Sequence, residues 1–133
     1  MTPDAHHLAS LAAAWMQELL PDGVDLDADT SGTIWWRGPE RFELGGIGFG
    51  SVAVQDGYPL RKALTSAMWG LLSGIQDHIS ESPPFEPWPA VPDHPRQLPL
   101  PEVEIDPDGN VTAGYMWDSR WVLRGPPLVL PLD

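Results

Sequence analysis

Apolar residues recur three and four positions apart in two stretches of the chain, a spacing that predicts two amphipathic helices. Thr2, Pro3 and Asp4 suit the start of the first helix, as a hydroxyl cap, a proline in the first turn and an acid near the positive end of the helix dipole. Residues 21–23, Pro-Asp-Gly, are expected to end it. The second helix is expected to begin at Pro59 and to run for about twenty residues, roughly 30 Å. The core-facing stripes would be Leu8, Leu11, Ala12, Trp15, Met16, Leu19 and Leu20 in the first helix, and Leu60, Ala63, Leu64, Ala67, Met68, Leu71, Leu72, Ile75 and Ile79 in the second.

Other stretches alternate apolar and polar residues, which is typical of strands that are buried on one face. In "VDLDAD", residues 24–29, the polar positions are all aspartates, so the exposed face of this strand would be acidic. A turn of Asp, Gly and Asn between two β-prone runs predicts a hairpin within residues 102–117. Further candidate strands are "TIWWR" (33–37), "RFELGGIGFGSVAVQ" (41–55) and "RWVLR" (120–124), and the chain ends in the apolar tail "LVLPLD" (128–133).

The order of elements is helix, strands, helix, proline-rich loop, strands. This order predicts a single α+β domain over residues 1–133, with two layers in which an antiparallel sheet is covered by the two main helices.

The proline-rich loop at residues 83–101 contains Phe85 and Trp88. A linker would leave both aromatic side chains in water with no second domain to connect. Proline reduces the entropy lost when a loop is fixed, so an ordered strap over the core is predicted. A recognition peptide in the polyproline II conformation remains the alternative.

The net charge of the chain limits the classes of partner that it is expected to bind. The chain has 19 acids and 7 bases, for a net charge of −12, so phosphate backbones would be repelled and a nucleic-acid partner is not expected. There is no cysteine, which excludes disulfides, thiolate catalysis and most structural zinc sites. Neither a signal peptide nor a membrane segment is evident, and a soluble cytoplasmic protein is expected.

Asp25, Asp27 and Asp29 have the spacing of the first ligands of a calcium-binding loop. The rest of that loop is missing, because Thr30 stands where the sharp turn needs glycine and Trp36 where a bidentate glutamate is needed. The three aspartates are therefore predicted to form an exposed acidic face. His6 and His7 are adjacent on the first helix and point apart, and His78 and His94 fall on other predicted elements, so no metal and no cofactor are expected.

Trp35 and Trp36 are consecutive in a predicted strand and must face opposite sides of the sheet. One of them is either covered by a second layer or exposed for contact. On the polar side of the second helix, Asp77, His78 and Glu81 form a group that could perform general acid–base chemistry, although such groups are common on helix surfaces.

The leading prediction is a non-enzymatic, acidic protein-binding module, such as an immunity protein, antitoxin, chaperone or inhibitor-like adaptor. It would contact a basic protein partner, and neither nucleic acid nor membrane; a homodimer remains open. The predicted binding residues are Asp25, Asp27, Asp29, Trp35 and Trp36. The alternative is a small-molecule binding or enzyme domain whose tryptophan-lined pocket uses Asp77, His78 and Glu81.

Overall fold

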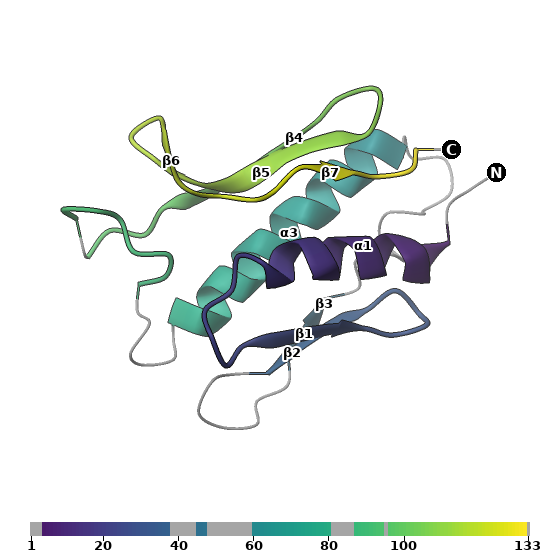
Figure 1. Cartoon of the computed structure of the whole chain (residues 1–133), viewed down its shortest axis with the longest axis horizontal. Helices are drawn as coiled ribbons and strands as arrows, with labels where there is room; N and C mark the ends of the chain where they lie inside the picture. The colour runs from purple at the N-terminus through teal and green to yellow at the C-terminus, as the bar shows by residue number, and fades with distance from the viewer. Residues whose placement is uncertain (1–3, 38–44, 48–59, 81–86, 95, 133) are drawn as a thin grey trace.

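A computed structural model describes residues 4–37, 45–47, 60–80, 87–94 and 96–132 of the chain (Figure 1). The helices are α1 (Ala5–Gln17) and α3 (Leu60–Ser80), and the strands are β1 (Asp25–Ala28), β2 (Ile34–Arg37), β3 (Gly45–Ile47), β4 (Leu100–Ile105), β5 (Asn110–Trp117), β6 (Arg120–Arg124) and β7 (Leu128–Val129). All the strand pairs are antiparallel. The predicted α+β class and the predicted order of elements are confirmed.

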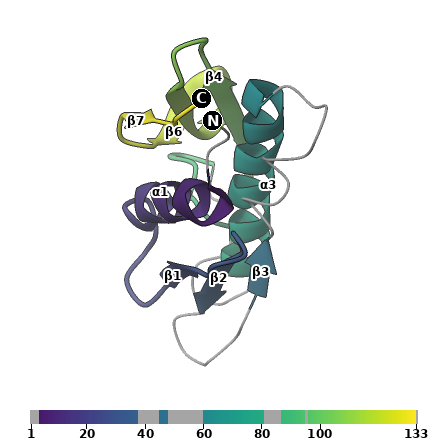
Figure 2. The ribbon, with the colours of Figure 1, turned by 90° about the vertical axis from the view of Figure 1, so that its right-hand side faces the viewer.

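The strands form two sheets rather than one. Sheet A has the order β1-β2-β3, and sheet B has the order β4-β5-β6 with β7 also paired to β5. The two helices lie between the sheets, with sheet B on one side and sheet A on the other (Figure 2). Because α1 lies between other elements, it buries Ala9 and Ala13 in addition to the predicted stripe.

The stripes predicted for both helices face the core. The residues of those stripes that are buried are Leu8, Ala12, Trp15 and Met16 in α1, Leu19 in the turn just after α1, and Ala63, Leu64, Ala67, Met68, Leu71, Leu72, Ile75 and Ile79 in α3. The start of α1 differs from the prediction. Its N-cap is Asp4 rather than Thr2, because the Asp4 carboxylate accepts a hydrogen bond from the backbone N–H of His6 at 3.1 Å. Neither described helix is long and apolar enough to cross a membrane.

Two buried hydrogen bonds fix α3 against the second half of the chain. The Tyr115 hydroxyl of β5 donates to the Leu72 carbonyl at 2.6 Å, and the Gln76 side-chain amide donates to the Pro99 carbonyl at 2.6 Å. Each bond satisfies polar atoms that would otherwise be costly to bury. Sheet B and the end of the proline-rich segment are therefore attached to the same face of α3.

The described part of the proline-rich segment also contacts the core. Trp88 is buried, and its ring meets the Tyr115 ring edge-on with centroids 5.3 Å apart. The backbone N–H of Trp88 donates at 3.0 Å to the hydroxyl of Ser80, the last residue of α3. Phe85, the other aromatic residue of the predicted strap, lies outside the described residues.

Candidate functional site

The pairing of β1 with β2 places two of the three predicted acidic residues, Asp25 and Asp27, on the outer face of sheet A. Asp27 lies directly opposite Trp35, and Leu26 lies opposite Trp36. Opposed residues share one face of a sheet, and successive residues of a strand alternate between faces. Asp25, Asp27 and Trp35 therefore lie on one face, where all three are exposed, and we call them the acidic hairpin face.

Of the two consecutive tryptophans, Trp35 is 42% exposed and Trp36 is 7% exposed. The Trp36 ring packs against α3, where it meets the ring of His78 with centroids 5.6 Å apart and planes at 64°. It also lies 3.8 Å from the position that a Cβ on Gly74 would occupy. Of these two residues, only Trp35 is open to a partner.

Asp29 lies in the turn between β1 and β2. Its carboxylate accepts hydrogen bonds from the Ser31 hydroxyl at 2.6 Å, the Ser31 and Thr33 backbone N–H groups at 2.9 and 3.0 Å, and the Trp35 indole N–H at 2.9 Å. Asp29 therefore organises the turn and orients the Trp35 ring. These bonds, led by those from the Ser31 hydroxyl and the Trp35 indole, hold the pKa of Asp29 well below its ordinary value.

The lowered pKa of Asp29 predicts a pH-dependent contribution to stability. A carboxyl whose folded-state pKa is depressed stabilises the fold above its unfolded pKa, about 4, and this contribution is lost as the pH falls toward the folded pKa. Asp29→Asn should therefore be less stable than the wild type at pH 7, and the difference should narrow below about pH 4. Melting temperatures of both proteins between pH 2 and pH 7 would test this, and a difference that does not change with pH would contradict it.

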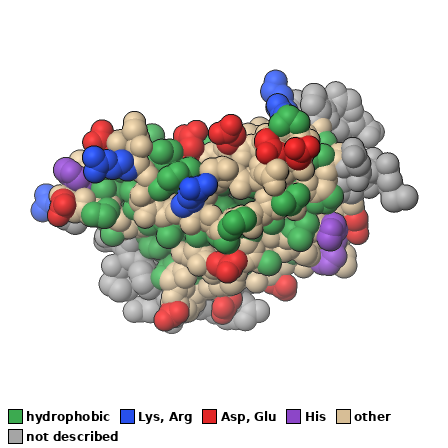
Figure 3. Space-filling model, turned by 45° about the horizontal axis from the view of Figure 1, so that its top comes forward, with side chains coloured by type: hydrophobic (Ala, Val, Ile, Leu, Met, Phe, Trp, Pro, Cys, Tyr) green, Lys and Arg blue, Asp and Glu red, His purple; other side chains and the backbone are tan. Residues whose placement is uncertain are grey.

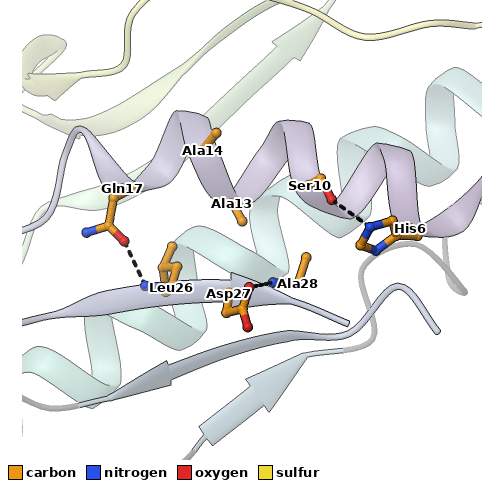
Figure 4. A pocket seen from close by; sticks show the side chains of 8 residues that line it. All are labelled: His6, Ser10, Ala13, Ala14, Gln17, Leu26, Asp27 and Ala28. Atoms are coloured by element: carbon orange, nitrogen blue, oxygen red, sulfur yellow. Dashed lines mark hydrogen bonds between the residues drawn. The ribbon is translucent and has the colours of Figure 1, made fainter. Parts of the chain in front are cut away.

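A groove of about 420 Å³ lies between α1 and β1 (Figure 4). Gln17 closes one end, where its side-chain oxygen accepts the Leu26 N–H at 2.7 Å and its nitrogen donates to the Val24 carbonyl at 2.8 Å. His6 closes the other end, where its Nδ1 lies 2.8 Å from the Asp29 carbonyl oxygen. The groove, which we call the β1 groove, is lined by His6, Ser10, Ala13, Ala14 and Gln17 from α1 and by residues 26–28 of β1.

Ser10 and His6 are the one candidate nucleophile and base in this groove. The Asp29 carbonyl can accept only from a protonated Nδ1, which leaves Nε2 as an acceptor for the Ser10 hydroxyl. The distance between Ser10 Oγ and His6 Nε2 is 3.5 Å, longer than a strong hydrogen bond. The Asp27 carboxylate beside the groove would also oppose a developing oxyanion. This pair therefore gives little support to acyl transfer.

The group predicted for the alternative function is only partly described. Asp77 is exposed and His78 is half-buried against Trp36, whereas Glu81 lies outside the described residues. Among the described residues, no three histidine, cysteine or carboxylate side chains gather closely enough to hold a metal ion. A second hollow, of about 450 Å³, is lined by parts of β5 and by residues 124–129. No tryptophan lines either of these two hollows.

The outer face of sheet B is a competing surface. Hydrophobic, acidic and basic side chains are mixed on the side of the molecule shown in Figure 3. Leu100 of β4 is 69% exposed, and Glu102 and Glu104 alternate with inward-facing residues along the same strand. Sheet B thus provides a second exposed pair of strand carboxylates. It also carries Trp121 on β6, which is half-buried with the Arg124 guanidinium 5.6 Å from its ring centroid. The described contact of Trp121 is with a base, whereas Trp35 is hydrogen-bonded to the carboxylate of Asp29.

Sequence reasoning missed the α1 side of the groove. Gln17 and Ser10 lie outside the apolar stripe of α1, and polar residues in such positions are usually solvated. No family model matches the chain, and the comparisons with curated proteins and with solved structures give no match either.

Proposed function

We propose that the protein is a non-enzymatic, acidic protein-binding module that contacts a basic protein partner through the acidic hairpin face. Immunity proteins, antitoxins, chaperones and inhibitor-like adaptors act in this general way. The observation that carries the proposal is the exposed Trp35 ring, which Asp29 holds in place beside the exposed carboxylates of Asp25 and Asp27. The proposed setting is the cytoplasm, where proteins without disulfides are typical.

Trp35 has the properties of an interface anchor. Tryptophan is enriched among the few residues that supply most of the binding energy in interfaces. The hydrogen bond from the Trp35 indole to Asp29 restricts the ring before a partner arrives, which lowers the entropy lost on binding.

The acidic charge would act at an earlier step of binding. A net charge of −12 attracts a basic protein over a distance, and the local carboxylates of Asp25 and Asp27 select its orientation. Charge is therefore expected to control association, and burial of Trp35 is expected to control dissociation.

Binding kinetics of a partner recovered from the cell would separate these effects. Reversing Asp25 and Asp27 to lysine should slow association and flatten its dependence on salt. The matched control reverses Glu102 and Glu104 of β4, which changes the net charge by the same amount on another exposed strand face. This control should retain more of the wild-type association rate.

Trp35→Ala should accelerate dissociation by more than about tenfold, or about 1.4 kcal/mol. Trp69→Ala is the control, because Trp69 is an exposed tryptophan, 50% exposed, on α3 rather than on the hairpin. Unchanged kinetics after both the charge reversal and Trp35→Ala, with the fold intact by circular dichroism, would reject the acidic hairpin face. If no protein partner is recovered and a small molecule raises the melting temperature, the ligand-binding function takes its place.

A further inference from the structure

β1 is an edge strand of sheet A, and α1 runs along its outer edge. The backbone N–H of Asp29 donates to the Thr33 carbonyl at 2.9 Å, which identifies this pair as hydrogen-bonded across the hairpin. In an antiparallel pair, hydrogen-bonded and non-hydrogen-bonded positions alternate. The backbone groups of Asp27 therefore point toward β2, and those of Leu26 and Ala28 point outward into the β1 groove.

Gln17 already occupies part of this edge in the manner of a strand. Its amide accepts from the Leu26 N–H and donates to the Val24 carbonyl, as the C=O and N–H of one residue in an added parallel strand would do there. The contact shows that α1 leaves room for a peptide-like group at the β1 edge. It also ends the free part of the edge at Leu26.

Beyond Gln17 the edge is open. Within the described chain, no hydrogen bond involves the carbonyls of Leu26 and Ala28, and the Ala28 N–H is bonded only to the carboxylate of its neighbour Asp27 at 3.0 Å. The open stretch ends at His6, which contacts the Asp29 carbonyl. His6 and Gln17 are roughly 16 Å apart along α1, the length of about five extended residues.

We propose that an extended segment of the basic partner binds in the β1 groove and adds to β1 as a further strand of sheet A. This proposal rests on the proposed function and names the part of the partner that is recognised. The segment would donate to the Leu26 and Ala28 carbonyls and accept from the Ala28 N–H, once the Asp27 carboxylate releases it. That carboxylate then pairs with a basic side chain of the segment.

The two faces of β1 specify the side chains of the segment. Positions beside Asp25 and Asp27 would carry lysine or arginine, because opposite charges on adjacent strands attract. Positions beside Leu26 and Ala28 would be small, because Ala13 and the partly buried Leu26 leave limited space there. A second copy of this chain fits poorly, because its own β1 would place aspartates beside aspartates.

The probe is a nine-residue peptide of alternating lysine and alanine, titrated into isotope-labelled protein and followed by the amide resonances. The expected result is saturable shifts centred on Leu26 and Ala28, and slower hydrogen exchange of the Ala28 N–H. A control peptide in which every second backbone nitrogen is methylated lacks the N–H donors for the Leu26 and Ala28 carbonyls. It should bind at least tenfold more weakly. The peptide of alternating glutamate and alanine should not bind.

Ser10→Phe tests the groove itself. Ser10 is partly exposed and lines the groove, so a phenylalanine there would fill the space while leaving the acidic hairpin face unchanged. Binding of the lysine peptide should fall at least tenfold. The control is Ser66→Phe, the same exchange at an exposed position of α3, which should bind as the wild type does.

Several outcomes would overturn the proposal. One is the absence of amide shifts at Ala28 up to about millimolar peptide, and another is equal peptide binding by the wild type and by folded Ser10→Phe. A third is a set of peptide-induced shifts centred on β4. A fourth is a shift at Ala28 that depends on protein concentration without peptide, which would indicate a second copy of the chain. If Ser10→Phe leaves partner kinetics unchanged while Trp35→Ala accelerates dissociation, the groove is rejected and the proposed function survives. If Trp35→Ala and the charge reversal have no effect on partner binding, the proposed function itself fails.

Discussion

Replacing Trp36 with alanine should lower the free energy of unfolding by about 3–5 kcal/mol, the usual cost of removing a large buried aromatic side chain. Trp36 is 7% exposed, and its ring packs on α3 beside His78 and Gly74. Its indole nitrogen is buried with no hydrogen-bond partner among the described residues, so its contribution is apolar packing. Loss of the side chain would open a cavity between sheet A and α3, and chemical denaturation would measure the cost.

Trp35→Ala is the matched comparison, one residue earlier in the same strand. Its side chain is 42% exposed and makes one hydrogen bond, to Asp29, so its loss should cost no more than about 1 kcal/mol. A shift of one residue in strand register would exchange the faces of the two tryptophans. Equal losses from the two substitutions, or a larger loss from Trp35→Ala, would therefore contradict the pairing of β1 with β2.

The sequence predicted the two faces of this hairpin but could not tell which one is covered. The alternation in residues 24–29 is a local pattern, and it placed the strand and the exposed Asp25 and Asp27 correctly. It was wrong for Asp29, which lies in the turn after β1 rather than on the strand face. Which of Trp35 and Trp36 is buried depends on α3, which lies far along the chain and contributes Gly74 and His78 to the contact. A pattern of period two contains no information about that contact.

The same limit applies to the architecture and to the β1 groove. Helix periodicity predicted α1 and α3, and the alternating runs predicted the strands, but neither pattern reports whether two groups of strands share one sheet. The burial of Ala9 and Ala13 shows that a second layer covers α1. In a sequence, alanine is a weak signal of such burial, because it is common on both buried and exposed faces of helices. The groove requires α1 to lie along the β1 edge, which only the folded chain shows.

Tyr115→Phe should reverse the order of stability between the wild type and the variant as the pH rises. At pH 8 the wild type should be more stable by about 1 kcal/mol, because the buried Tyr115 hydroxyl donates to the Leu72 carbonyl. The hydroxyl is kept neutral in the fold, since burial, with a smaller contribution from the charge of Asp77, raises the pKa of Tyr115 far above its ordinary value.

The direction of the pH effect follows from linkage. A group whose folded-state pKa is raised stabilises the fold fully below its unfolded pKa, about 10, and this stability is lost as the pH rises toward the folded pKa. The wild type should therefore lose about 1.4 kcal/mol per pH unit above pH 10 through Tyr115, and the phenylalanine variant should not. Near pH 11 the advantage of the wild type would be cancelled or reversed.

The ionisation of Tyr58 and of the basic residues is common to both proteins and cancels in the difference. Denaturation at pH 8 and pH 11 measures this difference, and parallel losses in the two proteins would mean that the pKa of Tyr115 is not raised in the fold.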